Sequence, residues 1–117
     1  MKKIIALVLV LCLALALCAC GGSKAKEENN VIKIGVYEPQ SGDNGAGGKQ
    51  EILGMQYANY VTPSVEVGGK TYKVELVYAD NASSNDKAPT AAQTLISSGV
   101  SVVLGSYGSG VSIHWKN

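Results

Sequence analysis

The chain opens with an aliphatic run that no charged side chain interrupts. Met1, Lys2 and Lys3 precede it, and residues 4–16 are almost purely aliphatic. A short positive segment followed by an apolar stretch is typical of a secretory signal. An uncleaved transmembrane anchor is the alternative, because the stretch approaches the minimum of about 17 residues that span a bilayer. Both interpretations place the rest of the chain outside the cytoplasm.

A polar stretch follows this run. Residues 21–30 (GGSKAKEENN) contain no apolar residue beyond Ala25. Such a composition cannot bury enough surface to fold by itself. We therefore interpret residues 20–30 as a flexible tether and expect a single folded domain over residues 31–117.

From residue 31 the hydrophobic pattern alternates between strand and helix. Val31–Tyr37 is apolar and β-branched, which predicts a strand with most of its surface covered. The stretch 49–61 predicts a helix, and Gly68-Gly69 predicts a turn before a second strand over 71–78. The apolar positions of that helix form a broad stripe: Ile52, Leu53, Met55, Tyr57, Ala58, Tyr60 and Val61.

A second helix and a third strand complete the pattern. Residues 86–98 predict a helix with Pro89 in its first turn, preceded by a polar loop at 80–85 whose last residues can cap it. Its apolar face consists of Ala88, Ala91, Ala92, Leu95 and Ile96. Residues 100–104 predict the third strand. The order β-α-β-α-β predicts an α/β fold, with a parallel sheet and helices on its faces.

Three polar loops follow the three predicted strands, at 38–48, 79–86 and 105–110. In open parallel sheets, ligands bind outside the carboxyl ends of the strands. We therefore expect these loops to form a shared ligand edge.

Charge and cysteine content exclude several classes of function. The formal net charge is +1, and Lys2 and Lys3 belong to the signal, so the folded part is nearly neutral and has no basic cluster for nucleic acid. All three cysteines, Cys12, Cys18 and Cys20, lie in or beside the signal, which leaves no disulfide pair. The single histidine, His114, cannot build a zinc site, and we predict neither metal nor cofactor.

The sequence also does not match the nucleotide-binding and catalytic motifs that we considered. The glycines before Lys49 have the wrong spacing for a phosphate-binding loop, and Gln50 replaces the required Ser or Thr. Neither Ser106 nor Ser109 lies in a G-x-S-x-G turn. We predict that the protein is not an enzyme.

The loop at 105–110 carries the most informative chemistry. A helix that starts at about Ser109 or Val111 would direct free backbone N–H groups toward the ligand edge, where they favour a carboxylate. The hydroxyls of Ser106 and Ser109 could add hydrogen bonds, and Tyr107 could cover an apolar ligand surface. The alternative is an ordinary turn whose serines cap the helix.

The end of the apolar run resembles the lipobox of bacterial lipoproteins. Leu17 stands three residues before Cys20, and the small Ala19 stands directly before it. Cys18 fits less well, because Leu17 would occupy the position that requires a small side chain. The resemblance implies that residues 1–19 are a lipoprotein signal peptide and that lipid on Cys20 anchors the chain to the outer face of the plasma membrane, within the cell envelope.

Two segments resemble the extracellular solute-binding proteins of ABC importers, of the leucine, isoleucine and valine type. They read IKIGVYEPQSGDNGAGGKQEILGMQYANYV and YKVELVYADNASSNDKAPTAAQTLISSGVSVVLGSYGSGVS. The resemblance implies a two-lobed protein that closes around one amino acid and presents it to a membrane permease, without chemistry. The chain would supply a partial doubly wound parallel sheet, half of the first lobe.

The same resemblance implies which residues contact the ligand. Ser109, with Gly108 and Tyr107 beside it, would bind the α-carboxylate and α-ammonium of the amino acid. Tyr37, Gln40 and Ser41 would lie near the mouth of the cleft.

The chain departs from the family after Ser112, where it reads Ile113-His114-Trp115-Lys116-Asn117 and lacks the family's fourth strand and second lobe. We therefore expect residues 31–117 to be a truncated first lobe. One alternative is a small structural or interaction lipoprotein without a small-molecule ligand. Another is an enzyme on a flavodoxin-like sheet.

Overall fold

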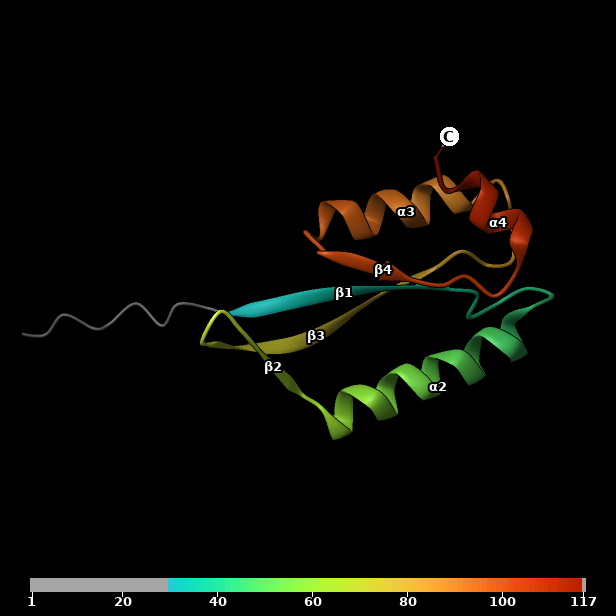
Figure 1. Cartoon of the computed structure of the whole chain (residues 1–117). Coiled ribbons are helices and arrows are strands. Elements are labelled where there is room, and N and C mark those ends of the chain that lie inside the picture. The colour runs from blue at the N-terminus through green and yellow to red at the C-terminus, as the bar shows by residue number, and fades with distance from the viewer. Residues whose placement is uncertain (1–29, 117) are drawn as a thin grey trace, which may run out of the picture.

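A four-stranded sheet forms the centre of the computed structural model, which describes residues 30–116. Its strands are β1 (Val31–Glu38), β2 (Ser64–Val67), β3 (Lys70–Asp80) and β4 (Val102–Leu104), in the order β2-β3-β1-β4 (Figure 1). Strand β1 pairs in parallel with both β3 and β4, which confirms the predicted parallel α/β core. The predicted signal, the tether before Asn30 and Cys20 lie outside the described residues.

Strand β2 is an addition that the sequence did not predict. It pairs antiparallel with β3 across the Gly68-Gly69 turn, where both glycines have positive φ angles of 59° and 76°. Its sequence, SVEV, alternates polar and apolar residues, but four residues are too few to be recognised as a strand, and only Val65 is partly buried. The sheet is therefore parallel in its centre and has one antiparallel edge.

Helices cover both faces of the sheet. Helix α2 (Gly45–Val61) lies on one face, and α3 (Ala88–Ser97), α4 (Ser109–Ile113) and the 3-10 turn η1 (His114–Lys116) lie on the other (Figure 1). The predicted side-chain cap of α3 is wrong. No side chain caps the helix, and the backbone amides of Lys87 and Ala88 both donate to the Ser84 carbonyl, at 3.1 and 3.0 Å.

Helix α2 begins at Gly45, not at Lys49 as predicted. The glycines that indicated a loop are needed for close packing instead. A Cβ atom at Gly48 would lie 2.1 Å from the Pro39 carbonyl oxygen, so only glycine allows the first turn of α2 to pack against the segment after β1.

The hydrophobic core lies between the sheet and α3. It contains Tyr37, Ala79, Ala88, Ala91, Leu95 and Val111. The Tyr37 hydroxyl lies 3.3 Å from the Ala88 carbonyl oxygen and 3.2 Å from that of Val111, and burial raises the pKa of this phenol. The Trp115 ring packs edge-on against Tyr37, with centroids 4.7 Å apart. Tyr37 thus connects α3, α4 and η1 within the core, so its predicted place near the mouth of the cleft is wrong.

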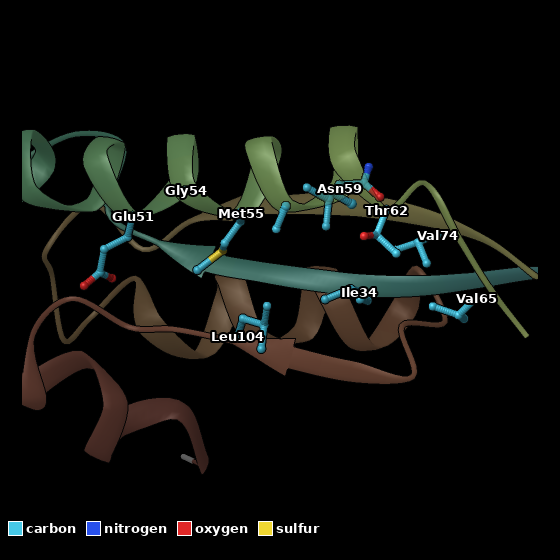
Figure 2. A pocket seen from close by; sticks show the side chains of 11 residues that line it. Ile34, Glu51, Gly54, Met55, Asn59, Thr62, Val65, Val74 and Leu104 are labelled. Carbon is cyan, nitrogen blue, oxygen red and sulfur yellow. The ribbon is translucent and has the colours of Figure 1, made fainter. Parts of the chain in front are cut away.

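The predicted apolar stripe of α2 is only partly correct. Ile52 is buried, whereas Leu53, Tyr57, Tyr60 and Val61 are 57–83% exposed on the outer side of the helix. An open groove of about 590 Å³ separates the inner side of α2 from the sheet (Figure 2). Its lining is mostly apolar and includes Ile34, Met55, Val74, Leu76 and Leu104.

Candidate ligand-binding edge

The loops after β1, β3 and β4 meet at the carboxyl edge of the sheet (Figure 1). This arrangement follows from the parallel pairing, because Glu38, Asp80 and Leu104 end three adjacent strands. Hydrogen bonds join all three loops to one another, as described below. The shared edge predicted from the sequence is therefore present.

Asp80 connects the β1 loop to the β3 loop. Its carboxylate accepts hydrogen bonds from the Gln40 amide (2.8 Å), the Ser41 hydroxyl (2.7 Å) and the Ala82 amide (2.8 Å). Burial raises the pKa of Asp80, but these hydrogen bonds outweigh it and hold the pKa below its ordinary value. A stable carboxylate thus fixes two of the residues predicted to lie at the cleft mouth, Gln40 and Ser41.

Ser83 adds a second connection between the same loops. Its hydroxyl accepts from the Asn44 amide at 2.9 Å and donates to the Ser41 carbonyl at 3.1 Å. Ala82 and Ser83 both have positive φ angles, and a Cβ atom at Gly42 would lie 2.2 Å from the Ala82 carbonyl oxygen. The two loops are therefore in direct backbone contact.

Asn81 connects the β3 loop to the β4 loop. Its side chain is fully buried, donates to the Ser106 hydroxyl at 3.1 Å and accepts from the Ser83 amide at 3.0 Å. The hydrogen bond from Asn81 thus holds the Ser106 side chain in place. Its hydroxyl can still donate, since it accepts from Asn81.

Glu38 connects the end of β1 to the β4 loop. Its side chain is fully buried, and Oε2 accepts from the Tyr107 backbone amide at 2.7 Å. The Tyr107 ring lies over the first turn of α2, because a Cβ atom at Gly47 would lie 2.5 Å from the ring. The ring itself is 45% exposed at the edge.

Gly108 and Ser109 follow directly, at the start of α4. Gly108 precedes the helix with a φ of 124°, which favours glycine, and no side chain caps the helix. The serine-capping alternative is therefore wrong for this turn. Ser109 is exposed at the first helical residue, one of the two starts that we predicted.

The structure brings Gln40, Ser41, Ser106 and Tyr107 together through Asp80, Asn81 and Glu38. Glu38 and Asn81 were not predicted from the sequence. The available signal was a polar residue directly at or after the end of each apolar strand.

The described part of the chain, residues 30–116, contains neither a metal-binding cluster nor a membrane-spanning helix. No group of three or more His, Cys, Asp or Glu side chains in this part of the chain is arranged to hold a metal ion. No helix in the same range is both long and apolar enough to cross a membrane.

The loops at the carboxyl edge of this parallel sheet form one connected polar surface. This arrangement is typical of one lobe of an open α/β ligand-binding protein. Within that class, residues 31–116 match the periplasmic binding protein family. The chain belongs to this family, as its sequence resemblance predicted. Membership indicates a location outside the cytoplasm.

Solved structures agree with this assignment. A leucine binding protein, LivK, from Thermotoga maritima is 32% identical over 72% of the chain, with a TM-score of 0.64. LivJ from Streptococcus pneumoniae, in complex with isoleucine, is 29% identical over 73%, with a TM-score of 0.62. A solute binding protein from R. palustris, in complex with benzoate, is 26% identical over 73%, with a TM-score of 0.61. The comparison with curated proteins found no match.

The chain spans only 23–24% of the length of these three structures. It corresponds to part of one lobe of the periplasmic-binding fold, as predicted.

Proposed function

We propose that the chain contributes part of the first lobe of the substrate-binding component of an ABC importer, which captures a branched-chain or related amino acid and delivers it to a permease. The connected loops at the carboxyl edge are the observation that carries this proposal. The solutes named for the three relatives are leucine, isoleucine and benzoate, and each carries a carboxylate. No step of this function requires chemistry on the ligand.

Within this proposal the ligand carboxylate lies against the β4 loop. Ser109 donates from its exposed hydroxyl, and Gly108 and Tyr107 supply backbone groups beside it. Ser106 adds a second hydroxyl, while Gln40 and Ser41 form the near rim. The half-exposed Tyr107 ring covers an apolar part of the ligand.

Replacing Ser109 by alanine should weaken binding of L-isoleucine about tenfold, because a hydrogen bond to a charged group is lost. One lobe leaves much of the ligand in water, so we expect a Kd of about 1 mM for the chain, within reach of a titration followed by NMR. Ser97→Ala is the matched control, since Ser97 is also exposed but ends α3. Equal affinities for Ser109→Ala and the unaltered chain would argue against this role. No response to any amino acid would favour the interaction-lipoprotein alternative.

We also propose that lipid on Cys20 anchors the chain to the outer face of the plasma membrane. When the chain is expressed in a bacterium, mass spectrometry should find residues 1–19 removed and acyl mass added to Cys20. Cys20→Ala should keep the signal and gain no acyl mass, whereas Cys18→Ala should behave like the unaltered chain. Acylation that persists in Cys20→Ala would contradict the assignment.

A further inference from the structure

Glu38 occupies an unusual position for an acidic side chain. It has no exposed surface, although it ends a strand at an edge where the neighbouring loops are polar. Oε2 has a partner in the Tyr107 amide. No hydrogen-bond donor among the described residues reaches the buried Oε1, and a Cβ atom at Gly105 would lie 2.7 Å from it. A buried carboxylate with one unpaired oxygen is costly unless it is neutralised.

Among the described residues, a second carboxylate and not a cation acts on Glu38. Asp80 is its register partner on β3, but the Asp80 oxygens are occupied by Gln40, Ser41 and Ala82. From α2, Glu51 extends beyond the tip of β1 (Figure 2). Among the described residues, Glu51 is the charged group that acts on Glu38.

These groups change the acidity of Glu38 strongly. Burial raises its pKa, the Tyr107 N–H lowers it, and hydrogen bonding and repulsion from Glu51 raise it further, to about 7 from an ordinary value of 4.5. A neutral carboxyl group can donate through one oxygen while the other accepts. Protonation therefore provides the partner that Oε1 otherwise lacks.

We propose that Glu38 and Glu51 share one proton, and that this carboxyl pair is a positioning device that fastens the ligand loop at Tyr107 to β1 and α2. Glu38 Oε1 carries the proton and donates it to Glu51, while Oε2 accepts from the Tyr107 amide. The device rests on the proposed function for its purpose, because Tyr107 lies next to Gly108 and Ser109. Its existence can be tested without any ligand.

The pair makes the ligand loop sensitive to pH near neutrality. Because the folded pKa of Glu38 lies above the unfolded value, the folded state holds the proton more tightly. The stability contributed by the pair is complete below about pH 4.5 and is lost as the pH rises through about 7. Above that, the two carboxylates repel each other and Glu38 no longer donates to Glu51, so the connection from α2 to Glu38 and the ligand loop is lost, while the Tyr107 N–H bond to the charged Oε2 remains.

The test is a carboxyl-carbon NMR titration of the isotopically labelled chain from pH 4 to 9. We expect the Glu38 carboxyl to titrate with a midpoint near pH 7 and the Tyr107 amide proton to follow the same midpoint. Glu51→Gln should move the midpoint down toward 4.5, since it removes the repulsion and supplies an amide donor. Glu38→Gln should hold the Tyr107 amide at its low-pH position throughout, because the amide mimics the protonated acid.

Three results would overturn the pair: a Glu38 midpoint near 4.5, a Tyr107 amide that does not follow Glu38, or a midpoint unchanged in Glu51→Gln. If Glu38→Gln does not fold, Glu51→Gln still decides, because Glu51 is exposed. The ligand titration of Ser109→Ala is independent. If the carboxyl pair titrates as expected but the chain binds no amino acid, the proposed function is wrong and the carboxyl pair still stands.

Discussion

Replacing Gly48 by alanine should lower the free energy of unfolding by about 3 kcal/mol, at the upper end of what overpacking costs. The new Cβ atom would lie 2.1 Å from the Pro39 carbonyl oxygen and 2.8 Å from two Pro39 ring carbons. The nearest neighbour is backbone, so it cannot yield by a change of rotamer. Helix α2 must then move away from the β1 loop, and the midpoint of urea unfolding should fall accordingly.

Gly54→Ala is the matched control in the same helix. A Cβ atom at Gly54 would meet no atom within 4 Å. Because alanine favours a helix over glycine by about 1 kcal/mol, this variant should be more stable than the unaltered chain. If Gly48→Ala and Gly54→Ala shift the midpoint of urea unfolding in the same direction, the described packing of α2 is wrong.

Replacing Leu95 by alanine should lower the free energy of unfolding by about 3 kcal/mol, from lost burial and the cavity left behind. Leu95 has no exposed surface, and its Cδ1 atom lies 3.1 Å from the position that a Cβ atom at Gly35 would occupy. Strand β1 passes closely beneath this side chain, so little relaxation can fill the space. Chemical denaturation measures the loss.

Ile96→Ala controls for the removal of an aliphatic side chain from α3. Ile96 is 57% exposed, so its replacement should change stability by less than about 1 kcal/mol. A comparable loss in both variants would show that α3 packs on a face different from the one described.

The sequence predicted the central fold because hydrophobic spacing and chain order determine it. Hydrophobic periodicity alone predicted strands β1 and β3, both long helices and their order along the chain. Periodicity did not determine which apolar residues of a helix turn inward. Leu53, Tyr57 and Ile96 belong to predicted apolar stripes yet are exposed, since apolar residues surround more of each helix than the sheet covers.

The candidate site was predictable to a different extent. Parallel topology alone placed the three loops at one edge. The buried connections through Glu38 and Asn81 were not predictable, because the burial of a polar side chain depends on which loops fold over it. The start of α2 was missed for a related reason, since glycines that permit close packing look like loop glycines in a sequence.

The proposed function requires that the connected loops at the carboxyl edge bind a carboxylate-bearing amino acid. Chemical-shift mapping of the labelled chain during titration with L-isoleucine tests it most directly, because the α2 groove is a separate, apolar hollow in the same molecule. We expect chemical-shift changes at Gln40, Ser41 and residues 106–109 that saturate at about millimolar ligand. Shifts confined to the groove around Met55 and Val74, or no shifts at all, would contradict it.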